Sequence, residues 1–441
     1  MKTHFLALAV ASASLGVLIG GCSGGSNEST ADKSKHLDVV SFQGGFGIDF
    51  FKQAAKEYEA NHPGVTISLT GGPRVWEQLR PQFASGTPPS LTWPGWGMDY
   101  WALIYDKQVL PLNDALAKPA FDGKGTWRDT FDPALLKLGE YQGQQYELPY
   151  HYNIMGWWYN PDTFAKHGWA VPKTFSELIA LCPKIKAAGM APLTYQGQYP
   201  DYTIKGFLFP WVISIGGIKA ADDAQSLVPG AWKSDAFLQA ARMIKQLRDQ
   251  GFFEDGANSL SHTQSQTDFL AGKAAMIPCG TWLESEMKKT MPPGAKMAFM
   301  MPPVVDGGKG DPSAIMIGIE PWIIPTAGSN HELAIDFYKF MTSLDKAKQF
   351  VTECGTLTAI KGSDQAKMPE TLVEPARLFR QSKTVYSIQF DTWYSTLGTE
   401  SKHAMEALLN GSNTPEQFVD RLEAEAEKVR QSKKPIHTMT H

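Results

Sequence analysis

Residues 37–69 read LDVVSFQGGFGIDFFKQAAKEYEANHPGVTISL. The apolar run over 37–42 predicts a buried strand, and residues 65–69 alternate as a half-buried strand does. Between the two, a helix over Asp49–Asn61 would place four apolar side chains on one face, those of Phe51, Ala54, Ala55 and Tyr58. Strand, helix and strand in this order form a βαβ unit, which joins parallel strands. The stretch therefore predicts an α/β fold.

Helices and strands recur along the rest of the chain. Capping signals at Thr174, Ser329 and Thr414 each precede an apolar pattern with helical spacing. Short apolar runs at 274–277 and 322–324 predict strands of covered parallel sheets. Glycine and proline mark many loops, but no single low-complexity linker divides the sequence. We therefore expect two lobes between which the chain crosses more than once.

The composition favours a globular protein and argues against nucleic acid as a partner. Of the 441 residues, 43% are hydrophobic and 20% are charged, so the chain can bury a large core. The net charge is −4, and no concentrated basic stretch offsets it. We expect Cys182 to be a buried thiol, whereas Cys279 and Cys354 could form a disulfide in an oxidising exterior.

The beginning of the sequence has the pattern of an export signal. An apolar run over 5–19 leads into a lipobox-like site that ends at Cys22. We interpret 1–21 as a lipoprotein signal peptide and Cys22 as the residue that carries the lipid. Polar residues over 22–35 predict a flexible tether. The alternative is an ordinary cleaved signal with an incidental cysteine.

Local motifs of catalysis and metal binding are missing from the sequence. It contains no H-E-x-x-H, no C-x-x-C and no phosphate-binding G-x-x-x-x-G-K-[ST], so we expect no metal and no cofactor. His437 and His441 lie in a polar tail that we expect to be frayed and solvated. Two carboxylates far apart in sequence can still hydrolyse glycosides, which keeps an enzyme as an alternative.

Aromatic side chains in glycine- and proline-rich surroundings are the main functional signal. Aromatic residues make up 11% of the chain, and Trp93, Trp96, Trp282 and Trp322 lie beside apolar runs. A pyranose ring has weakly polar C–H faces and a rim of hydroxyls, so a sugar site combines flat aromatic faces with polar partners. Each tryptophan taken alone is equally compatible with a place in the core, whereas the set favours sugar binding.

Two polar side chains and one loop complete the candidate site. Asn153 and Glu320 lie next to aromatic residues and are candidate partners for sugar hydroxyls, with surface solvation as the alternative. The loop Gln43–Gly47 follows the first predicted strand. Its glycines would allow the backbone to approach a ligand closely, although the loop is equally compatible with a simple turn.

Several segments resemble a known family. They are YELPY at 146–150 with WYNP at 158–161, PKTFSEL at 172–178, KAAGMAP at 186–192, and GKAAM at 272–276 with GTW at 280–282. These segments are similar to those of the extracellular solute-binding lipoproteins of bacterial ABC sugar importers, the family of maltose-binding protein. FQGGFG at 42–47 and LTYQGQYP at 193–200 resemble the branch that binds N-acetylglucosamine and chitobiose.

The resemblance implies a fold of two α/β lobes, the type II periplasmic-binding-protein fold, with several interlobe crossovers. The crossovers would fall near 146–152, 276–280 and 323–329. Lobe 1 would then comprise 36–149 and 280–323, and lobe 2 would comprise 150–279 and 324–441.

The resemblance also assigns ligand contacts to the aromatic and polar residues. Asn153 stands where maltose binders have an acidic residue, which argues against maltose as the ligand. The residues expected to bind ligand are Gln43, Phe46, Trp93, Trp96, Tyr152, Asn153, Tyr202, Trp282, Glu320 and Trp322.

These expectations describe a sugar receptor that carries out no covalent chemistry. It would be a monomer, tethered by lipid outside the cytoplasm, that delivers a mono- or oligosaccharide to a transmembrane ABC permease. The ligand could be N-acetylglucosamine or chitobiose. The alternatives are a surface-tethered glycoside hydrolase, motivated by the same aromatic residues, and a lipoprotein adhesin.

Overall fold

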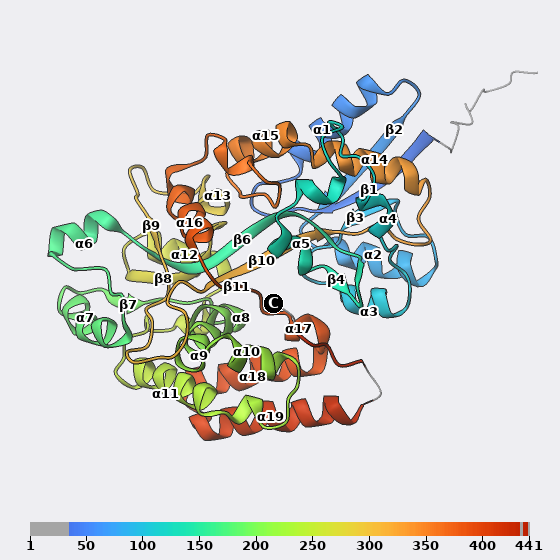
Figure 1. Cartoon of the computed structure of the whole chain (residues 1–441). Coiled ribbons are helices and arrows are strands. Elements are labelled where there is room, and N and C mark those ends of the chain that lie inside the picture. The colour runs from blue at the N-terminus through green and yellow to red at the C-terminus, as the bar shows by residue number, and fades with distance from the viewer. Residues whose placement is uncertain (1–34, 433–434, 440–441) are drawn as a thin grey trace, which may run out of the picture.

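The computed structural model describes residues 35–432 and 435–439, which form two lobes with a long strand running between them (Figure 1). The predicted signal peptide, Cys22 and the predicted tether up to residue 34 lie outside the described residues. One hydrophobic core lies around Phe51, Trp322 and Phe337, and the other lies around Trp211 and Phe237.

The first sheet confirms the βαβ unit predicted for the start of the fold. It contains β1 (His36–Phe42), β2 (Thr66–Gly72) and β3 (Leu91–Trp93) in the order β2-β1-β3, and both pairings are parallel. Helix α1 (Asp49–Asn61) joins β1 to β2 and buries the predicted apolar face. This sheet and α2 (Val75–Ala84) belong to the N-terminal lobe.

The second sheet joins the two lobes. Its order is β11 (Val385–Tyr386), β10 (Ile315–Trp322), β6 (Leu148–Tyr159), β8 (Ala274–Gly280) and β7 (Ala191–Leu193), and β9 (Ala298–Met300) also pairs with β6. The prediction of parallel sheets at 274–277 and 322–324 was wrong for the central pairs, because β6 runs antiparallel to both β10 and β8. The first part of β6 pairs with β10 and its last part with β8, so one strand of 12 residues contributes to both lobes.

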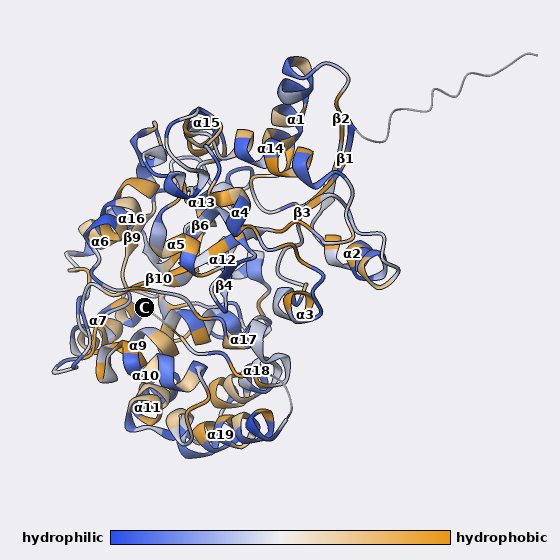
Figure 2. Ribbon diagram, turned by 45° about the vertical axis from the view of Figure 1, so that its right-hand side comes forward, coloured by the Kyte–Doolittle hydropathy of each residue, from blue (hydrophilic) through white to orange (hydrophobic). Residues whose placement is uncertain are grey.

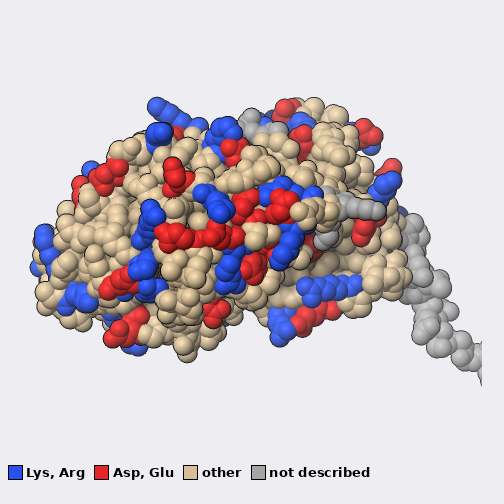
Figure 3. Space-filling model, turned by 90° about the horizontal axis from the view of Figure 1, so that it is seen from below, with Lys and Arg blue, Asp and Glu red and all other residues tan. Residues whose placement is uncertain are grey.

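Helices surround the far end of this sheet and form the second lobe. The main ones are α7 (Phe175–Ala187), α9 (Phe209–Gly216), α11 (Asp235–Asp249), α18 (Ser395–Asn410) and α19 (Pro415–Gln431). Hydrophobic and hydrophilic residues alternate along α19, as expected of a helix with one buried face (Figure 2). Ion pairs such as Arg242–Glu416 lie on the surface of this lobe, and basic side chains lie beside acidic ones on the face seen from below (Figure 3).

Two of the three capping predictions are confirmed, and the third was wrong. Thr174 and Thr414 each form a capping box, with Glu177 and Gln417 respectively. Helix α14 (His331–Met341) instead begins after Asn330, which has a left-handed backbone conformation. The Ser329 hydroxyl lies 3.1 Å from the hydroxyl of Ser90, so it ties the helix start to the first sheet and does not cap the helix.

The segment after residue 324 divides between the lobes, whereas the sequence assigned all of it to lobe 2. Helices α14 and α15 (Leu344–Cys354) pack against α1, and the Tyr58 hydroxyl donates a hydrogen bond of 2.6 Å to Asp336. Helices α18 and α19 pack against α11 in the second lobe. The apolar face of α1 must be covered by another element. Helix α14, from a distant part of the chain, covers it.

The remaining elements are shorter. They are α3 (Tyr100–Tyr105), α4 (Asn113–Leu116), η2 (Trp127–Thr130), α5 (Pro133–Lys137), β4 (Glu140–Tyr141), β5 (Gln144–Gln145), α6 (Pro161–His167), α8 (Asp201–Thr203), the π-helical turn η3 (Ile204–Leu208), α10 (Ile218–Gln225), η4 (Ala231–Lys233), η5 (Ala257–Ser259), α12 (His262–Leu270), α13 (Leu283–Met287), η6 (Ser363–Gln365), α16 (Glu370–Gln381) and α17 (Phe390–Trp393).

Three cysteines lie in the described part of the chain, and all are free thiols. Cys182 is fully buried, as predicted, and Cys279 and Cys354 do not form the disulfide that we considered. Within the described ranges, no single helix is both long and apolar enough to cross a membrane. The segments Asp201–Gly216 and Ile218–Gln225 meet those criteria only together, and the chain bends by 119° between them.

Candidate functional site

The polar centre of the candidate site lies where three strands of the second sheet meet. The Asn153 side-chain amide on β6 donates a hydrogen bond of 3.2 Å to Glu320 on β10. Thr281, directly after β8, donates from its hydroxyl to the Asn153 side-chain oxygen at 3.3 Å. Because the backbone N–H of Ile154 donates to the same hydroxyl at 3.2 Å, the Thr281 side chain is held in place. The sheet thus brings together two predicted site residues and Thr281, which sequence reasoning missed.

Glu320 is a carboxyl group buried among polar and aromatic neighbours. It is 4% exposed, and burial raises its pKa well above the usual range. Contacts with the side chains of Asn153 and Trp93, together with the charge of Lys205, act in the opposite direction. Glu320 therefore has a defined orientation at the junction of the lobes.

Lys205 connects this centre to the second lobe. Its side chain forms a 2.8 Å ion pair with Asp391 on α17. Although burial alone lowers the pKa of Lys205, the charges of Asp391, Asp201 and Glu320 raise it, so the amine stays charged. Lys205 lies on the π-helical turn η3, a type of irregularity that is common at functional sites. The sequence contains no obvious signal for this turn.

Trp282 and Tyr202 form the aromatic side of the site. Trp282 follows Thr281, is partly buried, and has its ring centroid 6.0 Å from that of Tyr202, at an angle of 66°. The Tyr202 hydroxyl lies 2.6 Å from Nδ1 of His262, whose Nε2 lies 2.5 Å from a Glu286 oxygen. This chain of contacts fixes the Tyr202 ring beside Trp282, so the two predicted residues form one aromatic surface.

The last residue of β3 is a buried tryptophan, and the loop after β3 adds an exposed one. Trp96 is 57% exposed, and its ring reaches to 3.9 Å from the position that a Cβ would take on Gly318. Gly318 is paired with Asn153, so Trp96 lies over the β10 backbone beside the polar centre. Trp93 is 1% exposed and packs parallel to Phe46, with ring centroids 6.3 Å apart. Trp93 is therefore a core residue and does not offer a free ring face.

The loop predicted to approach the ligand lies against a helix next to Trp282. A Cβ on Gly45 would lie 3.0 Å from the Cα of Glu286 on α13, so this close approach requires glycine. Gln43 is exposed, whereas Phe46 is partly buried between Trp93, Phe51 and Phe350.

Tyr152 and Trp322 lie away from the polar centre, contrary to the sequence-based expectation. Successive side chains of a strand point to opposite faces, so Tyr152 points away from the face of Asn153 and packs on Phe379. Trp322 lies two residues after Glu320 on β10, and the pairing with β6 shifts register between Glu320 and Pro321, where β6 has the extra residue Tyr150. Both rings are buried in the core, at 4% and 1% exposure, and neither has a free face.

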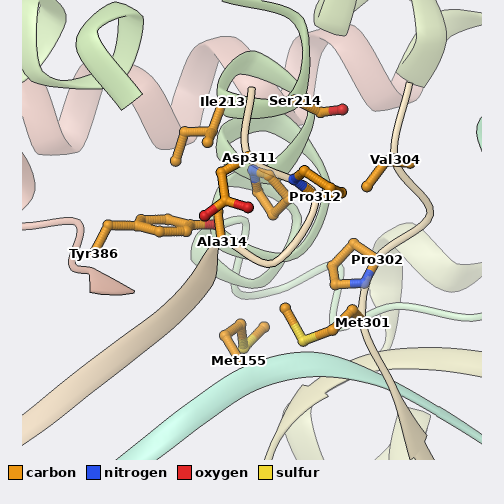
Figure 4. Close-up of a pocket in the computed structure, with 11 residues that line it drawn as sticks. Met155, Ile213, Ser214, Met301, Pro302, Val304, Asp311, Pro312, Ala314 and Tyr386 are labelled. Carbon is orange, nitrogen blue, oxygen red and sulfur yellow. The ribbon is translucent and has the colours of Figure 1, made fainter. Parts of the chain in front are cut away.

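A separate pocket lies within the second lobe (Figure 4). Met155 of β6, Ile213 and Ser214 of α9, and the loop around Pro302 and Asp311 line it. The Asp311 carboxylate accepts two hydrogen bonds of 2.8 Å from Ser313, so its charge stabilises the loop itself. This pocket is apart from the interlobe centre. In the described part of the chain, no group of three histidine, cysteine or acidic residues is arranged to hold a metal ion.

Comparisons with known proteins agree with this architecture. The chain is similar to the diacetylchitobiose binding protein NgcE of Streptomyces coelicolor, with 23% identity over 405 residues that cover 90% of this chain and 85% of that protein. It is also similar to the multiple sugar-binding protein of Streptococcus mutans, with 23% identity over 377 residues that cover 80% of this chain and 81% of that protein. Both relatives are binding proteins.

The fold and the family expected from the sequence are confirmed. A solved structure described as a chitin oligosaccharide binding protein superposes with a TM-score of 0.76, at 22% identity, and covers 90% of this chain and 99% of that one. The family profile for bacterial extracellular solute-binding proteins matches residues 47–348, which is more than half of the chain. The chain therefore belongs to the bacterial extracellular solute-binding proteins.

Proposed function

We propose that this protein is the carbohydrate receptor of an ABC importer and that it binds sugar between its two lobes. The observation that carries the proposal is the pairing of an aromatic surface, Trp282 with Tyr202, and a hydrogen-bonding centre, Asn153 with Glu320. Thr281 links the two, because it bonds to Asn153 and directly precedes Trp282. Flat C–H faces of a sugar match the rings, and its hydroxyls match the amide and carboxyl groups.

We further propose N,N′-diacetylchitobiose, or its monomer, as the ligand. Names of related binding proteins refer to diacetylchitobiose and to chitin oligosaccharide. Two acetamido groups would add amide donors and acceptors to the sugar. The side-chain amide of Asn153 and the hydroxyl of Thr281 are neutral groups suited to such partners. Of the predicted contacts, we retain Gln43, Trp96, Asn153, Tyr202, Trp282 and Glu320.

Lobe closure is the proposed mechanism. Sugar that touches both lobes binds the closed state better than the open one, so it shifts the population towards closure. The shape of the closed state is then what a transmembrane permease recognises. Strand β6 would carry the movement, because one end pairs with β10 and the other with β8. The protein would perform no covalent chemistry on its ligand.

The proposed location is outside the cytoplasm, with the chain held to a membrane by lipid on Cys22. The lipobox-like site and the polar stretch after it support this part of the proposal. The receptor would act as a monomer, because each copy contains both lobes.

Calorimetry and thermal shift test the proposal. Diacetylchitobiose at a large excess should raise the melting temperature, since a ligand that binds the native state stabilises it by mass action. The Asn153→Leu variant should bind about tenfold more weakly, because it loses one hydrogen bond at the polar centre. Asn61→Leu is the matched control, since Asn61 is exposed at the end of α1. Recovery of cleaved sugar would favour the hydrolase, and no saturable binding to any mono- or disaccharide would contradict the receptor.

A further inference from the structure

His437, within the described residues 435–439, is buried in an aromatic cage, whereas the sequence predicted a solvated tail. The His437 side chain stacks on Trp393 with ring centroids 4.4 Å apart and planes 10° from parallel. Its other ring neighbours are Trp101 at 4.9 Å and Tyr105 and Tyr141 at 5.4 Å each. His437 is 6% exposed, so an apparently polar tail residue is part of the interior.

The cage combines elements of both lobes. Trp101 and Tyr105 lie on α3, which follows β3 of the N-terminal lobe, and Trp393 lies on α17, which packs against α18 of the second lobe. The described tail residues lie against α17, through the contact of His437 with Trp393, and α17 is near the middle of the view in Figure 1. The tail is also held by its backbone: the His437 N–H donates to the Tyr394 hydroxyl at 2.8 Å. The Met439 N–H donates to the hydroxyl of Ser226 at 3.0 Å.

The cage adjoins the interlobe centre. Helix α17 carries both Trp393 and Asp391, and Asp391 forms a 2.8 Å ion pair with Lys205. The next residue, Gly206, lies against Pro278 of β8, the strand that leads to Thr281 and Trp282. On the other side, α3 begins at Tyr100, shortly after Trp96, whose ring reaches Gly318 of β10. Both walls of the cage thus continue into the proposed sugar site.

We propose that residues 435–439 form an intramolecular plug, in which His437 occupies the place of a sugar ring against Trp393 and leaves when ligand binds. This inference rests on the proposed function and adds a regulatory element to it. A flat ring parallel to an indole at this spacing has the geometry that a pyranose face would take. One cage cannot hold both rings, so tail and sugar compete. The free protein then binds sugar with an affinity reduced by the fraction of molecules whose cage is open.

The chemistry of His437 suits a plug that can be released. Burial lowers its pKa to about 4, so the imidazole is neutral near pH 7 and enters the cage without a charge to desolvate. The hydrogen bonds that hold the tail come from its backbone, and water can replace them when the tail leaves.

Truncation tests the plug directly. A chain that ends at Ser432 retains all of α19 and lacks the tail. It should bind diacetylchitobiose at least about threefold more tightly than the full chain in calorimetry, and His437→Ala should reproduce part of this gain. Ile436→Ala is the matched control, because Ile436 is 48% exposed in the same segment, and it should leave affinity unchanged. A synthetic peptide of residues 432–441 should weaken sugar binding by the truncated chain. Equal or weaker sugar binding after truncation would overturn the plug.

A second measurement keeps the plug testable if no sugar binds. The imidazole protons of His437 should show a ring-current shift in nuclear magnetic resonance spectra of the full chain, and Trp393→Leu should reduce it, because the parallel ring is lost while Trp101, Tyr105 and Tyr141 remain. Free-peptide chemical shifts for His437 in the full chain would overturn the plug whatever its ligand. A shifted His437 signal in a protein that binds no tested sugar would support tail docking and contradict the proposed function alone.

Discussion

Trp282 and Trp322 are both associated with strands of the same mixed sheet, yet they occupy different environments. Trp282 follows β8, is partly buried and lies beside Tyr202 on the aromatic surface of the proposed site. Trp322 ends β10, is 1% exposed and packs on Phe51 at 5.2 Å and Tyr338 at 5.8 Å. The neighbours make the difference, because Phe51 and Tyr338 enclose Trp322 in the core of the N-terminal lobe, whereas Trp282 lies just after the end of β8, before α13. A tryptophan beside a strand therefore indicates a binding site only where its face is free.

The largest expected effect is the loss of stability when Trp322 is replaced. Trp322→Ala should lower the free energy of unfolding by about 3–5 kcal/mol, because it leaves a cavity in the core. Urea denaturation measures this change. Trp322→Phe should cost less, since the Trp322 indole N–H makes no hydrogen bond to any described residue. Sugar affinity of the folded fraction should stay unchanged, and a loss of affinity without a loss of stability would place Trp322 in the site.

Substitution of Trp282 should have the reverse effect: sugar affinity should fall, and stability should change little. Trp282→Ala should weaken sugar binding at least about tenfold, or about 1.4 kcal/mol, because the sugar loses its aromatic face. Calorimetry measures the affinity, and the melting temperature of the free protein should change little. Trp169→Ala is the matched control, since Trp169 is partly buried away from the site and stacks on His167. Unchanged affinity in Trp282→Ala would refute its assignment as a ligand contact.

The smallest expected effect concerns the pH dependence of stability, which depends on the carboxyl groups near the two tryptophans. Near Trp282, Glu286 is paired with His262 and Gln266. Glu147 directly precedes the Leu148 that pairs with Trp322, and burial raises its pKa from 4.5 to about 8. Between these values the folded protein holds a proton that the unfolded chain has released, so stability falls as pH rises.

The pH dependence can be measured by comparing melting temperatures at about pH 5.5 and about pH 6.5. The wild-type protein should lose more stability over this interval than Glu147→Gln, which has no proton to release. The contribution of this one group is at most about 1.4 kcal/mol per pH unit. An equal loss in both proteins would mean that Glu147 does not carry this part of the pH dependence.

Local features of the fold were predictable from the sequence. The βαβ unit and the capping boxes at Thr174 and Thr414 depend on residues a few positions apart, and the structure confirms them. The antiparallel pairing of β6 depends on partners more than a hundred residues away, and its register shift is set by that pairing. No local pattern contains that information.

The candidate site was predictable in part for the same reason. Asn153 and Glu320 could be proposed because each lies close to aromatic residues in the sequence, and Trp282 because it follows a predicted apolar strand. Lys205 could not, because a π-helical turn within a continuous helical segment aims it at Asp391. His437 could not either, because its cage consists of residues from three distant segments. The position of Tyr152 away from the site was predictable from strand alternation, because its neighbour Asn153 was already assigned to the site and successive side chains of a strand point to opposite faces.

The return of the chain to both lobes affects the order in which the protein can fold during synthesis. The N-terminal lobe needs α14 to cover α1, and the second lobe needs α18 and α19 to cover α11. The N-terminal lobe cannot cover α1 until α14 has been translated, and the second lobe cannot complete its core until the last helix, Pro415–Gln431, has been translated. A nascent chain therefore exposes apolar surface until translation is nearly complete, which makes it a substrate for chaperones. It also stays unfolded, so it can still pass through a narrow channel.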